Sequence, residues 1–397
     1  MDETLERYES GKEIVDYLLG KKERCDEIKE SRKLFERMLY DQGLLGSFAS
    51  DSLGTGTRGI VSNILIDDQP GTWVIKDYFD EANDNFKHCL RTKPKVYKSN
   101  ITNKQKTIKP PYYKCPSTAY SEYVLSLFVS KLYEQGVCIN FLRTLDFVTC
   151  EESMDECKHR TTLRNLPDSE PTMFTRYMIM EKASSPLSKV FDATQAEGAF
   201  IQTLVATAIF QDVYKISHND LHIDNVMITP VEHTTWGGSS SSERSTGVAG
   251  ADYFHYSLHG TDIYFPAISF IIKIIDWGLG TKWKPPVIAQ FKYEDVIPNQ
   301  YTPQFDSLSV LFMFALLQPP TGLVREMFEH IFGETADDKF ESRIVNKLTS
   351  VLYGRPSLEV TRQHPEATAM KLLTNLQLMK RYMTKPEGGK IVTLGRI

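Results

Sequence analysis

Residues 216–228 read ISHNDLHIDNVMI, and this stretch decides how the rest of the chain is interpreted. Apolar residues flank a short run in which carboxylates, amides and the imidazoles of His218 and His222 crowd together. A loop that only joined two buried strands would not need so many hydrogen-bonding side chains. We therefore expect a site of chemistry here, with the carboxylate of Asp220 and the amide of Asn225 inside it.

A second polar residue follows an apolar run further along the chain. Residues 271–278 read IIKIIDWG, which is typical of a buried strand that ends at Asp276. A carboxylate at the end of such a strand suits a divalent cation. Asn225 and Asp276 together supply the oxygen ligands that Mg²⁺ prefers, so both are candidate metal ligands.

A glycine-rich stretch precedes both of these segments. Residues 54–61 read GTGTRGIV, and Gly54, Gly56 and Gly59 would let a backbone turn approach phosphates, with its N–H groups as donors. Alone, the string is as easily a structural turn between strands. The next segment reads as a strand that contains Lys76, whereas a dinucleotide-binding fold would place a helix there. Lys76 is either a point charge for nucleotide phosphates or a surface lysine lying along apolar neighbours.

Taken in chain order, these stretches resemble the signature motifs of the protein kinase superfamily, over about residues 45–320. Residues 54–61 resemble its glycine-rich loop, Lys76 its strand lysine, residues 218–225 its catalytic loop and residues 276–278 its Asp-Phe-Gly motif. The resemblance implies an α+β, bilobed fold with a small β-rich lobe and a larger α-rich lobe. It also implies phosphoryl transfer from ATP, with Mg²⁺ as the metal.

The resemblance implies a role for each matching residue. Asp220 would act as the catalytic base, and His222 would be a second catalytic residue in the same loop. Lys76 would hold the α- and β-phosphates, paired with Glu122 near the start of an amphipathic helix expected at 117–136. Asn225 and Asp276 would hold the metal, and Asp306 would be a buried aspartate that opens a central helix. The nucleotide-binding set would be Gly54, Gly56, Gly59, Val61, Lys76, the gatekeeper Met180, Glu181, Ala183 and, beneath adenine, Met227.

The sequence departs from the pattern of eukaryotic protein kinases at several positions. Asn219 stands where the family has an arginine that pairs with a phosphorylated activation loop, which implies an enzyme not switched in that way. No Ala-Pro-Glu follows Asp276, and His222 replaces a lysine. The loop is similar to that of aminoglycoside and choline kinases. Combined with Asp-Trp-Gly, it resembles the Ser/Thr protein kinases of large DNA viruses.

Three functions stay open on these residues. The leading prediction is ATP- and Mg²⁺-dependent transfer to Ser/Thr hydroxyls of proteins, favoured by the glycine motif, its spacing to Lys76 and a hinge-like strand at 177–181. A small-molecule phosphotransferase is favoured by His222 and by the missing Ala-Pro-Glu. A non-catalytic scaffold is disfavoured, because the chain keeps the charged and amide residues of every motif together.

The organisation predicted along the 397 residues is one catalytic unit with additions. Residues 1–44 would form a helical N-terminal extension. Residues 45–182 would form the small lobe, with a basic insertion at 84–116. Residues 183–397 would form the large lobe, with a flexible insertion at 231–262 and C-terminal helices.

Charge is distributed unevenly along the chain. The net charge is −5, yet residues 87–114 hold nine Lys and Arg and no acidic residue. This insertion is either a solvated loop or a docking surface for an acidic protein, nucleic acid or anionic lipid. The Ser/Gly-rich run at 237–247 is either a mobile insertion or a set of autophosphorylation sites at 239–242 and Ser245.

The sequence also bears on the compartment and on partners. Six scattered cysteines without metal-ligand spacing indicate free thiols in a reducing compartment. The N-terminus lacks the apolar region of a signal peptide, and the apolar runs are shorter than the roughly 20 residues that span a bilayer. We expect a soluble, cytoplasmic protein that acts on protein substrates, associated with virions if the chain is viral.

Overall fold

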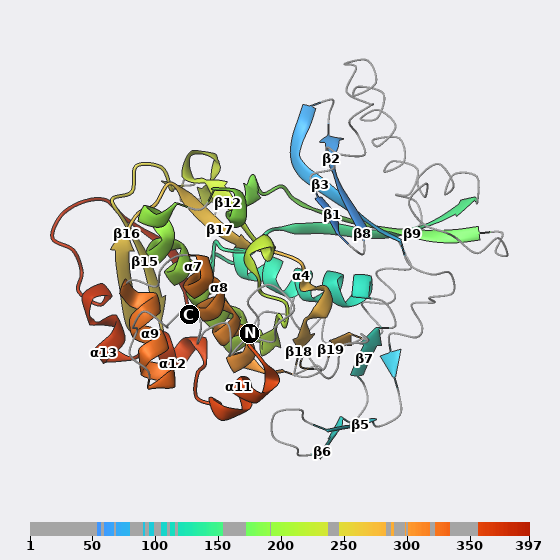
Figure 1. Cartoon of the computed structure of the whole chain (residues 1–397). Coiled ribbons are helices and arrows are strands. Elements are labelled where there is room, and N and C mark those ends of the chain that lie inside the picture. The colour runs from blue at the N-terminus through green and yellow to red at the C-terminus, as the bar shows by residue number, and fades with distance from the viewer. Residues whose placement is uncertain are drawn as a thin grey trace.

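The computed structural model is a mixed α+β structure, as the sequence predicts, with a five-stranded sheet beside a mainly helical part (Figure 1). The predicted extension at 1–44 and the Ser-rich run at 237–245 lie outside the described residues. The structure describes residues 54–56, 59–66, 69–79, 90–91, 95–98, 105–108, 112–115, 118–153, 172–190, 192–236, 246–282, 287–289, 298, 301–317, 322–333 and 356–397.

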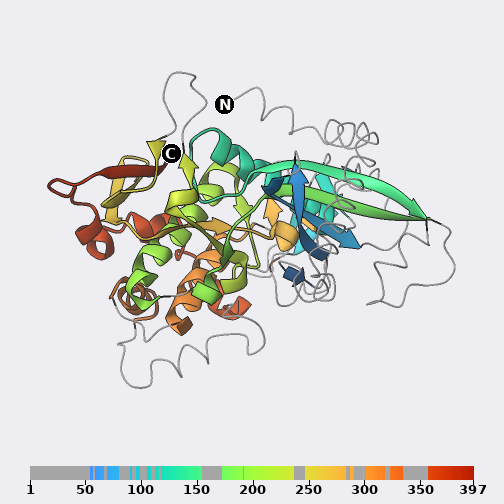
Figure 2. The same ribbon diagram turned by 90° about the horizontal axis from the view of Figure 1, so that it is seen from above.

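The five-stranded sheet is antiparallel and runs in the order β1-β2-β3-β9-β8. Its strands are β1 (Gly54–Gly56), β2 (Gly59–Ile66), β3 (Gln69–Phe79), β8 (Thr144–Ser153) and β9 (Thr172–Glu181). The pair Gly56 and Gly59 closes the β1–β2 hairpin, which confirms the predicted glycine-rich turn. Seen from above, β8 and β9 extend away from the helical part as a long hairpin (Figure 2).

Helix α4 (Thr118–Glu134) follows where the sequence predicts it, and Gly136 ends it with a positive φ of 69°. The prediction of an amphipathic helix is wrong, because all residues from 122 to 130 are buried. The reason is that α4 lies between two sheets. It contacts β8 on one side and β7, β18 and β19 on the other.

The second of these sheets is assembled from distant parts of the chain, in the order β11-β18-β19-β7-β4. Its strands are β11 (Ile216–Ser217), β18 (Thr281–Lys282), β19 (Val287–Ala289), β7 (Tyr112–Cys115) and β4 (Leu90–Arg91). Strands β7 and β4 belong to the basic insertion, so this insertion is not a loop throughout. Its remaining strands, β5 (Lys95–Lys98) and β6 (Gln105–Ile108), pair with each other.

The helical part is built around α7 (Ala196–Tyr214) and α8 (Pro303–Leu317). Both helices are buried nearly all round, because shorter helices pack against them. The helices that pack against them are α9 (Gly322–Phe332), α11 (Leu358–Gln363) and α12 (Ala369–Leu373). Two further short helices are α6 (Leu187–Val190) and α13 (Leu376–Met379), and α13 contacts α9 and α12. Asp306 lies in the first turn of α8, as predicted.

The insertion predicted as flexible at 231–262 is largely folded. It separates two paired strands, β12 (Val226–Pro230) and β17 (Phe270–Ile274). Within it, β15 (Tyr253–Leu258) and β16 (Thr261–Pro266) form an antiparallel hairpin. The apolar side chains of this hairpin are buried, and the predicted mobility is therefore wrong for residues 246–262.

The described chain ends in a strand, where the sequence predicts only helices. β20 (Ile391–Arg396) pairs in parallel with β15. It also reaches the segment after α4, where the Ile139 amide donates to Leu394 O over 2.9 Å and the Arg396 amide donates to Val137 O over 2.8 Å. One edge of the β15–β16 hairpin is thus paired with residues that lie far away in the sequence. Among the described residues, no helix is long and apolar enough to cross a membrane.

Candidate active site

Lys76 lies at the centre of a cluster of three charged side chains. It is on β3, opposite Val61 of β2 and Met178 of β9. Its Nζ lies 2.6 Å from Oε1 of Glu122 on α4 and 3.5 Å from Oδ1 of Asp276. Burial alone would lower the pKa of Lys76, but the two carboxylates outweigh it and raise the pKa above its usual value. Lys76 is therefore a fixed positive charge.

A buried carboxylate organises the backbone of residues 218–220. Asp306 accepts hydrogen bonds from the His218 amide over 2.8 Å and from the Asn219 amide over 2.7 Å. Gln211 Nε2 donates to the same carboxylate over 3.2 Å. Burial raises the pKa of Asp306 to about 7, although the two backbone donors act in the opposite direction. The loop thus depends on one side chain from α8.

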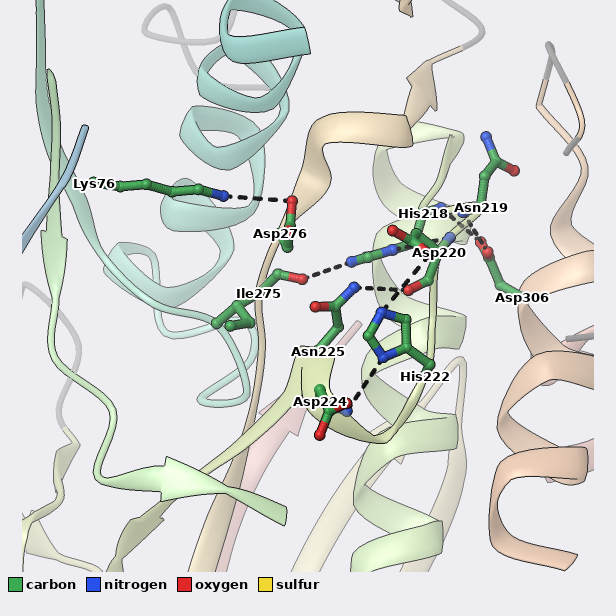
Figure 3. A network of polar contacts seen from close by, with 10 residues as sticks. All are labelled: Lys76, His218, Asn219, Asp220, His222, Asp224, Asn225, Ile275, Asp276 and Asp306. Carbon is green, nitrogen blue, oxygen red and sulfur yellow. Dashed lines mark hydrogen bonds and ion pairs between the residues drawn. The ribbon is translucent and has the colours of Figure 1, made fainter. Parts of the chain in front are cut away.

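His218 connects this loop to the segment that carries Asp276. A hydrogen bond of 2.8 Å joins its Nε2 to the carbonyl of Ile275, the residue before Asp276 (Figure 3). Its ring also packs against Trp277, with ring centroids 4.6 Å apart. Trp277 is buried and contacts the ring of Phe210 on α7. The two motifs that the sequence predicts to act together are therefore held in contact.

Asp220 and Asn225 lie in the loop between β11 and β12. Asn225 Nδ2 donates to the backbone carbonyl of Asp220 over 2.9 Å, and the Asn225 carbonyl accepts from the Ile275 amide over 3.1 Å. Because β12 and β17 are antiparallel, Asn225 precedes β12 at the same end of the strand pair where Asp276 follows β17. Figure 3 shows Asp220, Asn225 and Asp276 around this end of the pair, with Lys76 reaching toward Asp276.

His222 caps the short turn η5 (Ile223–Asn225). Its Nδ1 accepts from the Asp224 amide over 3.3 Å, so the ring proton of the neutral form is on Nε2. That nitrogen lies 3.9 Å from Oδ1 of Asp220. Burial lowers the pKa of His222, with Asp224 and Asp276 acting in the opposite direction. His222 therefore presents a neutral N–H toward Asp220 at pH 7.

The residues proposed to contact a nucleotide lie on neighbouring strands of the five-stranded sheet and, for Met227, on a separate three-stranded sheet of β10 (Ser185–Pro186), β12 and β17. The β1–β2 hairpin brings Gly54 opposite Val61, and Val61 pairs with Lys76. Met180 lies on β9, the next strand of the sheet, and pairs with Val74 of β3. Met227 on β12 pairs with Pro186 of β10, in the segment that follows Ala183.

One backbone group of Glu181, a residue of this set, is already occupied. Its amide donates to the Arg143 carbonyl over 2.8 Å, and its Oε2 accepts from the Arg143 amide over 3.2 Å. Because the amide is already used to join β9 to the start of β8, it is not available as a donor to an adenine ring. Only the carbonyl of Glu181 and the backbone that follows it fit the predicted contact.

The pair Asn225 and Asp276 fits Mg²⁺ better than a metal with an all-protein cage. No cluster of three His, Cys, Asp or Glu side chains able to hold a metal occurs within the described part of the chain. Mg²⁺ usually keeps one or two protein ligands and takes the rest from water and substrate phosphates. Asn225 directs its Nδ2 to Asp220, which leaves its side-chain oxygen as the ligand atom. The residues present are compatible with that mode of binding.

Sequence reasoning missed two buried polar residues that support the site from behind. Nζ of Lys273 on β17 donates to the carbonyls of Ile139 over 2.8 Å and Phe141 over 3.0 Å. Burial lowers the pKa of Lys273 to about 8. Asn140, between those carbonyls, binds Gln202 of α7 and Tyr256 of the hairpin. The only sequence signal was a lysine that interrupts an apolar run.

Comparisons with known proteins point to a distant relationship. No family model matches the sequence. The chain is 21% identical, over 192 residues, to a protein named "Probable serine/threonine-protein kinase 380R" from Invertebrate iridescent virus 6. This match covers 47% of the chain but only 33% of that protein. It supports a distant relationship to kinase-type phosphotransferases.

Proposed function

We propose that the chain is an ATP-dependent phosphotransferase with a kinase-like bilobed fold, which acts on Ser and Thr hydroxyls of proteins. The observation that carries the proposal is the contact of Lys76 with both Glu122 and Asp276. Three segments far apart in the sequence thereby meet at one positive charge. A surface lysine would not need two carboxylates from two other elements, one of them on a buried helix.

Lys76 would bind the phosphates of ATP that face the charged cluster. Glu122 is buried on α4 and holds the ammonium group in one position, so the side chain loses little further freedom when a phosphate arrives. The hairpin of β1 and β2 would cover the phosphates with backbone N–H groups, because its glycines place no side chain between them and the ligand.

Asp220 would orient the acceptor hydroxyl and accept its proton. The loop around it is held by Asp306 through the amides of His218 and Asn219, which fixes the backbone that leads into Asp220. Asn225 and Asp276 would hold Mg²⁺, which neutralises phosphate charge when bound. The neutral Nε2–H of His222 would donate to Asp220 or to a phosphate oxygen, without adding a full charge to the site.

A small-molecule acceptor is the second candidate, and one observation favours it. His222 replaces the lysine of protein kinases, and its ring is held in place by the Asp224 amide. The loop is similar in this respect to that of kinases with small acceptors. The relative named as a probable Ser/Thr kinase favours proteins instead, so the acceptor is decided by experiment.

The test is incubation of the purified chain with Mg²⁺ and γ-labelled ATP. One reaction contains generic protein acceptors, one contains aminoglycosides and choline, and one contains no acceptor. Label on Ser or Thr of protein, located by mass spectrometry, is the expected result. ATP turnover only with small acceptors would support the second candidate, and no turnover in any reaction would contradict both. Asp220→Asn is the matched control for a contaminating kinase.

A further inference from the structure

Strand pairing connects the basic insertion to the segment that follows Asp276. β19 pairs in parallel with β7, which places Val287 opposite Tyr113 and Ala289 opposite Cys115. β19 also pairs with β18, and β18 pairs with β11 directly before the loop that carries Asp220. A strand of the insertion thus extends the sheet formed by the segment after Asp276.

Asn219 holds the same segment from the other side. Its Nδ2 donates to the Leu279 carbonyl over 3.1 Å and lies 3.3 Å from Oγ1 of Thr281. The residue has a positive φ of 62°, a conformation in which asparagine is favoured over most other residues. The side-chain amide of Asn219 therefore contacts the segment at two points, Leu279 and Thr281. No phosphate group takes part in these contacts.

The segment also packs closely against α4. Lys282 Nζ lies 4.7 Å from the centre of the Phe128 ring. At Gly280 an added Cβ would lie 2.4 Å from Cδ1 of Leu125 and 3.0 Å from the Trp277 carbonyl oxygen, so a larger residue there would force the Leu125 side chain to move. Because α4 carries Glu122, the position of the segment and the position of the Lys76 partner are mechanically connected.

From these contacts we infer that the segment after Asp276 is placed by the chain itself, through β7 of the basic insertion and through the amide of Asn219. The inference rests on the proposed function and adds to it a positioning role for β7 and for Asn219. Asn219 is then a positioning residue. The basic insertion is a structural part of the active site, whatever else its charges bind.

Proline substitutions test the strand pairing. Alternate residues of a strand donate to opposite neighbours, so Lys114→Pro or Cys115→Pro must remove a donor from the β7–β19 pair. Val96→Pro is the control, because β5 pairs with β6 of the same insertion and, within the described residues, with no other strand. Hydrogen exchange followed by mass spectrometry should show at least a tenfold faster rate over residues 281–289 in one of the two variants, and the wild-type rate in Val96→Pro. Wild-type exchange in both variants overturns the inference.

A second pair of variants tests Asn219 even if the prolines prevent folding. Asn219→Gly suits the positive φ and removes only the amide, while Lys215→Gly makes the same change at another positive-φ residue. We expect Asn219→Gly to lower kcat about tenfold and leave KM for ATP unchanged, because the contacts of Lys76 are untouched. Thr281→Val should add little further loss in that background, since the two substitutions remove one shared contact. Independent, fully additive losses would overturn the role of Asn219.

The two tests separate this inference from the proposed function. If the wild-type protein transfers phosphate to no acceptor, the proposed function fails, but the exchange measurements still decide whether β7 holds the segment.

Discussion

Two groups of polar side chains lie around the same loop and differ in what they hold. The charged cluster of Lys76, Glu122 and Asp276 joins side chains to one another, and the Asp276 side chain is 42% exposed. The aspartate hub, in which Asp306 binds the amides of His218 and Asn219, joins a side chain to backbone and is fully buried. The first group is placed to meet a ligand, whereas the second shapes the loop that carries Asp220. Substitutions should therefore separate activity from stability.

The largest effect is expected at Asp220, which lies between the two groups. Asp220→Asn removes the proposed base but keeps the size of the side chain, and we expect phosphoryl transfer to fall by about 10²- to 10⁴-fold. The measurement is the initial rate with labelled ATP and a protein acceptor. Glu232→Gln, an exposed carboxylate outside the site, is the control. A rate near wild type in Asp220→Asn would remove Asp220 from the mechanism.

The next effect tests the charged cluster alone. Lys76→Met removes the positive charge and leaves a side chain of similar length, so we expect a loss of about 10²- to 10³-fold in kcat/KM. The protein should still fold, although thermal unfolding should occur at a lower temperature because the buried Glu122 loses its ion-pair partner. The exposed Lys189 gives the matched control Lys189→Met. If Lys76→Met instead unfolded the protein at unchanged specific activity, the cluster would be structural and the contrast with the hub would disappear.

The aspartate hub should show the opposite behaviour. Asp306→Asn replaces one side-chain oxygen, which accepts a hydrogen bond from a backbone amide, with an NH₂ group, which can only donate. We expect a loss of about 1–3 kcal/mol in the free energy of unfolding at pH 6. Asp276→Asn alters a partly exposed side chain of the charged cluster and should change that free energy little. Urea unfolding measured by tryptophan fluorescence compares the two variants. Equal losses in both would show that burial does not separate the groups.

A smaller effect concerns pH. The pKa of Asp306 is raised to about 7 in the folded protein, well above its ordinary value of 3.8. The folded state therefore keeps a proton that the unfolded chain has released. The stabilisation that the protonated Asp306 adds to the free energy of unfolding is present in full below about pH 4 and is lost as the pH rises through 7. The stability of wild type relative to Asp306→Asn should fall by on the order of 1 kcal/mol per pH unit between about pH 5 and 7. An increase over that range would contradict the raised pKa.

The sequence allows one of these groups to be predicted more completely than the other. Lys76, Glu122, Asp276 and Asp306 could all be placed because each lies in a short motif whose order along the chain is informative. The hydrogen bonds that Asp306 makes could be expected only in outline. Its partners Asn219 and Gln211 are separated from it by 87 and 95 residues, and no local pattern specifies such contacts.

Two other features could not be predicted for a different physical reason. The pairing of β7 with β19 uses backbone groups, which every sequence has, so the basic composition of the insertion hid it. Lys273 is buried through contacts with two carbonyls of another segment, whereas an isolated lysine in a strand is usually assumed to reach solvent. Composition also misled the prediction for residues 246–262, because the low-complexity run at 237–245 directly precedes this folded part.

The parallel pairing of β15 with β20 sets a condition on how this part of the chain folds during synthesis. The hairpin of β15 and β16 is complete long before its partner strand exists, since β20 is about 130 residues further along and ribosomes add roughly 5–20 residues per second. For several seconds at least, one edge of β15 would face the cell with unpaired N–H and C=O groups. Slowing translation after residue 266 should prolong the time for which this edge is unpaired.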